Sequence, residues 1–100
     1  MKRILIVTAW VHPGESNSSY MMEGFLNFIL NDSAEAKFLR SQLVLKVIPM
    51  SNPDGVICGN YRTSVSGNDL NRQYHDPDKH LHPTVLALKN LVASHSNLPN

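Results

Sequence analysis

Hydrophobic residues along this chain fall into short continuous runs and into longer stretches with helical spacing. Residues 3–10 form a nearly continuous apolar run with β-branched side chains, which predicts a short strand buried on both faces. Over residues 17–30 the apolar positions recur at helical spacing, which predicts a helix with Ser16 or Asn17 as its N-cap. The apolar face of this helix contains Met21, Met22, Phe25, Leu26, Phe28 and Ile29. We expect both methionines to fill the core.

The second half of the pattern predicts one more strand and two more helices. Asn31, Asp32 and Ser33 interrupt the first helix and can cap a second, short helix over residues 34–42. Residues 43–49 are rich in valine and isoleucine and predict a second strand, so the order of elements indicates a right-handed βαβ unit with parallel strands. Residues 50–78 predict a long irregular loop, and a final helix is expected from about residue 82 or 83 to residue 93.

These elements leave a parallel sheet of two strands with both edges open. Strands that are apolar on both faces need helices or further strands to cover them. We therefore interpret residues 1–100 as the opening part of a larger α/β domain, with partner strands supplied by residues beyond 100 or by another chain.

Composition and charge narrow the classes of partner. A chain of 100 residues with 42% hydrophobic and 17% charged residues can bury one modest core and has no room for a second domain. Nine basic and eight acidic residues give a net charge of +1 without a long run of either sign, so we expect no nucleic-acid or membrane partner. Cys58 is the only cysteine, which favours the cytosol, and the short apolar run near the start does not predict a signal peptide.

The first motif with chemistry is His12 with Glu15, on a loop that leaves the first strand. This spacing allows an imidazole nitrogen and a carboxylate to converge on one cation, and two histidines with one glutamate are a common zinc ligand set. The pair taken alone is weak evidence for a metal site, because a solvated loop whose carboxylate stabilises the start of the next helix has the same spacing.

The second motif, Asn-Pro-Asp-Gly at residues 52–55, predicts a β-turn after the second strand. It opens the long loop at the same edge of the sheet as the His12 loop, where open α/β sheets bind ligands. In that loop Arg62, Asn71 and Arg72 supply groups that hold a carboxylate or an oxyanion. The alternative for each arginine is a surface ion pair, such as Arg72 with Asp69.

Taken together, three segments resemble one known family in their order and spacing. They are residues 12–17 (His-Pro-Gly-Glu-Ser-Asn), 52–57 (Asn-Pro-Asp-Gly-Val-Ile) and 67–73 (Gly-Asn-Asp-Leu-Asn-Arg-Gln). They closely resemble the zinc metallocarboxypeptidases, specifically the cytosolic carboxypeptidase branch. The resemblance runs from the first strand to the last helix and implies an α/β/α sandwich, of which residues 1–100 are the N-terminal portion of the catalytic domain.

The resemblance also implies roles for five residues. His12 and Glu15 match the first two ligands of one zinc ion, and Arg62 matches the arginine that stabilises the transition state. Asn71 and Arg72 match the pair that grips the terminal carboxylate of the substrate. The implied activity is the release of C-terminal residues from protein tails, notably glutamates of tubulin, in the cytoplasm and in association with the cytoskeleton or cilia.

Departures from the family pattern leave alternatives open. Trp10 stands where an arginine is often found, two residues before the motif histidine. The family's third zinc ligand and its catalytic glutamate have no counterpart before residue 100, so we expect no peptidase activity from residues 1–100 alone. The alternatives are a non-catalytic remnant that binds peptide carboxylates or a partner, and a zinc amidohydrolase that acts on small acylated amino acids.

Histidines and glutamates elsewhere do not fill the vacant roles. His75, His80, His82 and His95 lie outside the family's context for the third ligand, and Glu23 and Glu35 lie in predicted helices. Polar histidines in a loop are usually solvated, so we expect no second metal cluster at His75, His80 and His82.

Overall fold

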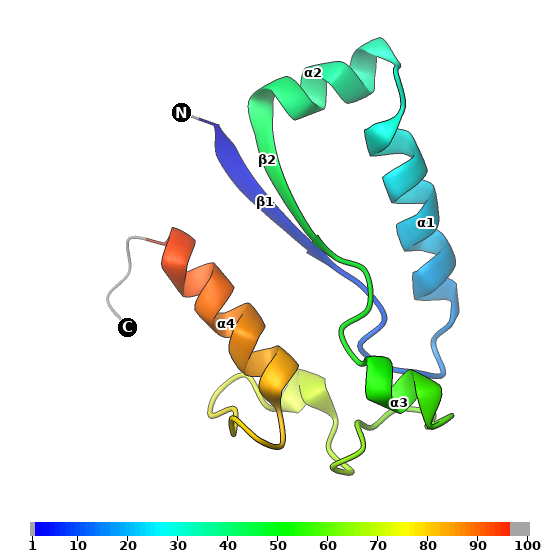
Figure 1. Ribbon diagram of the computed structural model, residues 1–100, viewed down its shortest axis with the longest axis vertical. Helices are drawn as coiled ribbons and strands as arrows, with labels where there is room; N and C mark the ends of the chain where they lie inside the picture. The colour runs from blue at the N-terminus through cyan, green and yellow to red at the C-terminus, as the bar shows by residue number, and fades with distance from the viewer. Residues whose placement is uncertain (1, 97–100) are drawn as a thin grey trace.

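The computed structural model describes residues 2–96 and contains two strands and five helical segments (Figure 1). In chain order these are β1 (Arg3–Thr8), α1 (Asn17–Leu30), α2 (Ala34–Gln42), β2 (Leu43–Ile48), α3 (Pro53–Ile57), the 3-10 helix η1 (Leu70–Arg72) and α4 (Pro83–His95). The predicted bounds of α1 and α2 are confirmed. Both strands end slightly earlier than predicted, and α4 continues two residues further, to His95.

The two strands form a parallel sheet, as predicted, and their carboxyl ends point toward the motif loops. Arg3 pairs with Leu43 at one end of the ladder and Thr8 pairs with Ile48 at the other. The backbone contact continues past the strands, because Ala9 N–H donates to the Ile48 carbonyl and Ser51 N–H donates to the Ala9 carbonyl. The loops after β1 and β2 therefore begin side by side, at the lower end of the sheet in Figure 1.

The corner between α1 and α2 is stabilised by a cap and by one arginine. Ser33 Oγ accepts a hydrogen bond from Ala36 N–H at 3.2 Å, which satisfies a free donor at the start of α2. Arg40 donates to the carbonyls of Ile29 and Asn31 at the end of α1. Ala36, which is fully buried, lies on the inner face of this corner.

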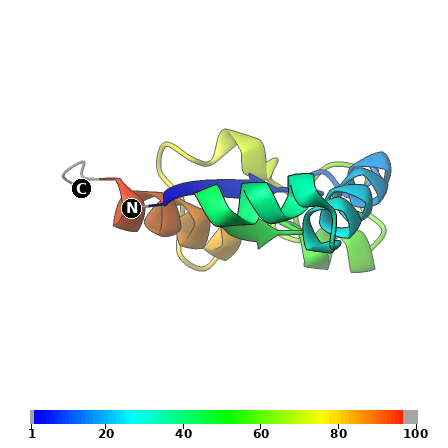
Figure 2. The same cartoon turned by 90° about the horizontal axis from the view of Figure 1, so that it is seen from above.

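Two predictions about burial are wrong for the described residues. Met22 and Ile29 are buried, but Met21 is 73% exposed, because consecutive helical positions point about 100° apart and only one face of α1 turns toward the rest of the described residues. Ile4 and Leu5 of β1 also remain 40% and 42% exposed, so β1 is not buried on both faces within residues 2–96. Seen from above in Figure 2, the elements form a thin layer, with extents of 44 × 35 × 15 Å.

The predicted β-turn at residues 52–55 is instead the start of a helix. Asn52 is the N-cap of α3, its Oδ1 accepts from Gly55 N–H at 3.1 Å, and Pro53 occupies the first turn. An asparagine followed by proline suits both a turn and a helix N-terminus, and hydrogen bonds such as Cys58 N–H to the Asp54 carbonyl extend it into a helix here. The predicted loop of residues 50–78 is thus interrupted by α3 and η1.

No helix within residues 2–96 has the length and apolar character needed to cross a membrane.

Candidate metal and substrate site

The loop that carries His12 and Glu15 is folded tightly against the end of β1. Trp10 adopts a left-handed backbone conformation (φ 54°), which turns the chain away from the strand direction. Its indole Nε1–H donates to the Pro13 carbonyl at 2.8 Å and closes the loop. Gly14 N–H donates to the Tyr61 carbonyl at 2.7 Å, and a Cβ at Gly14 would lie 2.5 Å from the Tyr61 ring, so only glycine fits there.

His12 and Glu15 come together as the sequence predicted. His12 is 7% exposed, its Nδ1 lies 3.2 Å from Glu15 Oε1, and its Nε2 lies 3.0 Å from Asp69 Oδ1. When the Asp69 carboxylate accepts the Nε2 proton, the neutral imidazole presents the Nδ1 lone pair toward the Glu15 carboxylate. Two acceptors this close repel each other unless a proton or a cation lies between them, and the pair has the donor chemistry that zinc prefers. Their role as metal ligands remains a prediction.

Asp69 is the residue of the site whose role the sequence did not predict. Its Oδ1 accepts from His12 and from Asn71 N–H at 3.0 Å, and its Oδ2 accepts from Arg62 Nε and Nη2, both at 2.9 Å. The hydrogen bond from His12, together with those from the Asn71 amide and Arg62, lowers the pKa of Asp69 to about 2, although burial acts in the opposite direction.

Of the surface ion pairs considered as alternatives for the two arginines, the one between Arg72 and Asp69 does not form, because the carboxylate pairs with Arg62 instead. Asp69 is the N-cap of η1, so its side chain folds back over the start of that helix while Arg72 lies at the other end. The Arg72 backbone N–H, not its guanidinium, contacts Asp69, through the Asp69 carbonyl at 3.0 Å.

The three groups expected to handle substrate are all exposed. Asn71 and Arg72 belong to η1, and within residues 2–96 neither side chain has a hydrogen-bond or ion-pair partner. The charge of Arg62 is partly offset by Asp69, whereas that of Arg72 is available to an anion. Asp69 thus connects Arg62 with His12. Asn71 and Arg72 follow Asp69 by two and three residues in the chain.

A third ligand does not join the pair within the part of the chain that the structure describes. No group of three histidine, cysteine, aspartate or glutamate side chains there could hold a metal ion, and no second metal cluster forms. His82 nevertheless corrects the expectation of a solvated side chain, because it is only 5% exposed. His75, His80 and His95 are not buried.

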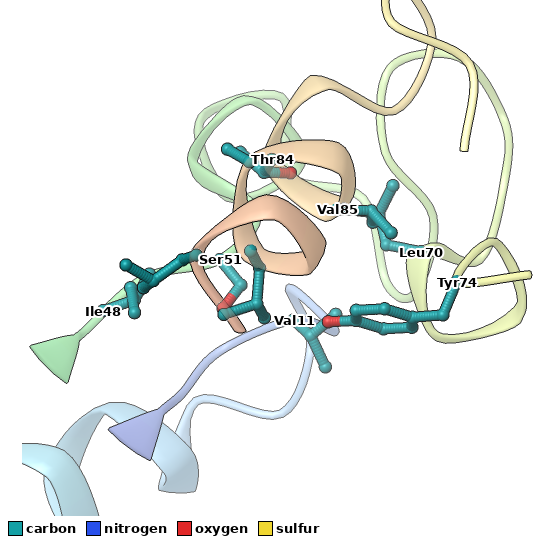
Figure 3. Close-up of a pocket in the computed structure, with 10 residues that line it drawn as sticks. Val11, Ile48, Ser51, Leu70, Tyr74, Thr84 and Val85 are labelled. Carbon is teal, nitrogen blue, oxygen red and sulfur yellow. The ribbon is translucent and has the colours of Figure 1, made fainter. Parts of the chain in front are cut away.

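An apolar cavity of about 300 Å³ lies beside η1, between α4 and the end of β2 (Figure 3). Its lining includes Val11, Ile48, Leu70, Tyr74 and Val85. Burial raises the pKa of the Tyr74 hydroxyl. The cavity contains no charged group from the metal pair or from Arg62, so the chemistry belongs to the polar loops rather than to this space.

Known proteins of one family are similar in sequence to this chain. The family model described as zinc carboxypeptidase matches residues 1–96. The chain is 54% identical over 91 residues to cytosolic carboxypeptidase 2 of Xenopus tropicalis and 52% identical over 91 residues to cytosolic carboxypeptidase 3 of Mus musculus. Each match covers 91% of this chain and 9% of the relative, so the chain spans about a tenth of the length of these relatives.

Solved structures agree with this result and confirm the fold class that the sequence predicted. The metallo-carboxypeptidase from Burkholderia cenocepacia matches with a TM-score of 0.88 and 32% identity, over 96% of this chain and 27% of that chain. A metallo-carboxypeptidase from Pseudomonas aeruginosa matches with a TM-score of 0.87 and 34% identity, over 94% of this chain and 25% of that chain.

Proposed function

Because this chain belongs to the zinc carboxypeptidase family, we propose that the protein containing it is a metallocarboxypeptidase that releases C-terminal residues from peptides and proteins. The observation that carries the proposal is the His12 and Glu15 pair, 3.2 Å apart, with Asp69 behind the imidazole. The relatives are named cytosolic carboxypeptidases, which supports a cytoplasmic location.

The pair fits two positions of a zinc site. His12 would bind through Nδ1, because Nε2 is already engaged by Asp69, and Glu15 would bind through its carboxylate. A bound zinc ion supplies Lewis-acid chemistry for hydrolysis of the scissile amide. Asp69 keeps the proton of His12 on Nε2 and orients the ring, and carboxylates behind ligating histidines commonly have this effect.

The arginines and Asn71 would act on the substrate. Arg62 is held by Asp69 through Nε and Nη2, which leaves Nη1 to stabilise negative charge that develops on the carbonyl oxygen. Asn71 and Arg72 present an amide and a guanidinium on adjacent residues of η1, and a planar guanidinium binds a carboxylate through two parallel hydrogen bonds. This arrangement selects a substrate with a free terminal carboxylate.

We extend the proposal to acidic protein tails as substrates, with release of C-terminal glutamates and with tubulin as one such partner at the cytoskeleton or cilia. The resemblance to the cytosolic branch supports this choice. Arg72 also supports it, because no described residue offsets the charge of this exposed guanidinium and a free positive charge attracts an acidic chain.

The test uses the native protein that contains this chain, loaded with zinc, and a set of matched peptides. We expect release of the last residue from peptides ending in glutamate, loss of release when the C-terminal carboxylate is amidated, and loss on metal removal with recovery when zinc is restored. Peptides ending in lysine or phenylalanine measure the preference for glutamate. Sequencing the native transcript downstream of codon 100 shows whether an in-frame histidine and glutamate complete the site.

Other outcomes favour the alternatives. Hydrolysis of small acylated amino acids without release from peptides would indicate an amidohydrolase. Absence of zinc binding together with retained binding of peptide carboxylates would indicate a non-catalytic remnant.

A further inference from the structure

His82 is a buried histidine outside the metal site, and it joins two segments far apart in the sequence. It precedes α4 as its N-cap residue and is 5% exposed. Its ring Nδ1 accepts a hydrogen bond from the Asp78 backbone N–H at 3.1 Å, and the His82 backbone N–H donates to the Asp78 carbonyl at 2.9 Å. On the other side of the ring, Nε2 lies 3.0 Å from the side-chain amide of Asn68.

The hydrogen bonds determine which nitrogen of His82 carries the proton. A backbone N–H can only donate, so Nδ1 is unprotonated and the neutral ring carries its proton on Nε2. Nε2–H then needs an acceptor, and the Asn68 amide must face it with its oxygen rather than its nitrogen. The structure has the amide nitrogen Nδ2 of Asn68 at 3.0 Å from Nε2, and 3.2 Å from Ser66 Oγ. A turn of the amide by 180° puts its oxygen there instead, which gives Nε2–H its acceptor while the Ser66 hydroxyl can donate to the same oxygen.

Asn68 ends a closed turn that leads directly into the metal site. Ser64 N–H donates to the Asn68 carbonyl and Gly67 N–H donates to the Ser64 carbonyl, both at 3.0 Å. Gly67 has a left-handed backbone (φ 78°), which this turn requires. The next residue is Asp69, whose carboxylate holds His12, Arg62 and the start of η1.

We propose that His82 is a positioning residue for the proposed metal site. It fixes the position of Asp69 through its hydrogen bond to the neighbouring Asn68. The inference rests on the metal-binding function proposed above. The ring of His82 ties the start of α4 to the turn of residues 64–68, and Asp69 is one covalent step beyond its contact. Loss of the ring lets the turn shift, and Asp69 then no longer holds Nε2–H of His12 in one orientation.

The main test measures zinc affinity in the native protein by chelator competition, below the melting temperature of each variant. Loss of a group that orients a ligand typically costs about 10- to 100-fold in metal affinity. His82 lies two residues beyond such a group, through Asn68, so we expect His82→Phe to raise Kd about tenfold, at the lower end of that range. His80→Phe is the matched control, because His80 is exposed and lies only two residues before His82. The Kd of this variant for zinc should equal that of the native protein.

Two variants of Asn68 test the assignment without altering His82. Asn68→Asp keeps an oxygen that accepts from Nε2–H, so zinc affinity should stay within about twofold of the native value. Asn68→Leu keeps the size and removes the acceptor, and it should reproduce the effect of His82→Phe. Equal affinities of the Asp and Leu variants would overturn the proposal.

A double-mutant cycle separates positioning from general stability. If His82 acts through Asp69, His82→Phe should add little to the loss caused by Asp69→Asn, whereas independent effects would add. Additive losses, or a His82→Phe protein that binds zinc as the native protein does, would contradict the inference while leaving the proposed function intact.

A measurement without metal tests the role of His82 separately from zinc binding. In ¹H–¹⁵N spectra of the metal-free native protein, we expect one sharp Nε2–H signal from His12, because Asp69 holds that proton, and we expect His82→Phe to broaden or abolish this signal. An unchanged His12 spectrum in His82→Phe would sink the inference even if the protein bound no zinc.

Discussion

At the scale of single residues, Asp69 links the groups that the proposed function needs. It contacts His12 from one oxygen and Arg62 from the other, and it caps η1, which carries Asn71 and Arg72. Its low pKa follows from these donors, so the carboxylate stays charged at any pH at which a protein is normally handled. The positions of the proposed metal ligand His12 and of the proposed substrate-binding residues Asn71 and Arg72 therefore depend on one side chain.

The variant Asp69→Asn should weaken zinc binding about 10- to 100-fold, as expected when a carboxylate behind a ligating histidine is lost. Asparagine keeps the size, but it has no negative charge for His12 or for Arg62. Zinc competition assays on the native protein and its variant measure the change. Asp76→Asn serves as the control, because Asp76 is exposed; a similar loss in both variants would contradict the role of Asp69.

Trp10 provides a second prediction at this scale. Its indole donates to the Pro13 carbonyl between the two proposed ligands, so Trp10→Phe removes the hydrogen bond that closes the loop but keeps most of the ring. A net loss of about 1 kcal/mol corresponds to about a fivefold weaker zinc affinity. Trp10→Arg restores a donor of suitable length and should bind zinc more tightly than the Phe variant. Equal affinities for both variants would show that the hydrogen bond does not matter.

At the scale of elements, the loops after β1 and β2 are joined by Asn52. Its Oδ1 caps α3, and its Nδ2 donates to the Val11 carbonyl at 3.1 Å, directly before His12. Gly55 completes this packing, because a Cβ there would lie 2.7 Å from both Asn52 and Pro13. The short helix α3 thus packs against the loop that contains His12 and Glu15.

Asn52→Ala should destabilise the native protein more than a variant that loses a cap alone. The missing cap costs about 1 kcal/mol, and the half-buried Val11 carbonyl left without its donor costs about 1 kcal/mol more. Ser33→Ala, which removes only the cap of α2, is the matched control and should cost about 1 kcal/mol. Denaturant unfolding measures both free energies, and equal values would refute the bridging role of Asn52.

At the scale of the whole molecule, apolar surface remains open on both the sheet and α1. The exposed fraction is 42% for Leu5, 41% for Val44 and 73% for Met21, and the layer of described residues is thin. The matched solved structures are about four times as long as this chain, and in parallel sheets both faces are normally covered.

Residues 1–100 produced alone should therefore bind a dye for apolar surfaces and self-associate in solution, because exposed apolar patches and open strand edges promote association. Sedimentation velocity and dye fluorescence measure these effects. The native protein is the control and should show neither at the same concentration. A monomeric fragment that does not bind the dye would contradict this expectation.

Local rules predicted most of the elements. Helical spacing located α1 and α2, and Ser33 located the start of α2, because both signals depend on neighbours in the sequence; Ser16 precedes α1 without a side-chain capping bond. Two apolar runs located the parallel strands. Exposure of Met21 and of β1 could not be predicted from periodicity, because the pattern indicates which face is apolar but not which segment covers it. The segment that begins at Asn52 is a helix rather than the predicted β-turn for a related reason, since asparagine followed by proline can start either one.

The amino-acid sequence by itself determined the family of this protein and the five residues proposed for its site, because their chemistry lies in short motifs of fixed order. Only the tertiary structure showed that Asp69 joins His12 to Arg62 and that His82 is buried against Asn68. These contacts join segments that are separated along the chain. The pairing of β1 with β2 sets where their loops meet, and caps and turns then decide which side chains face one another.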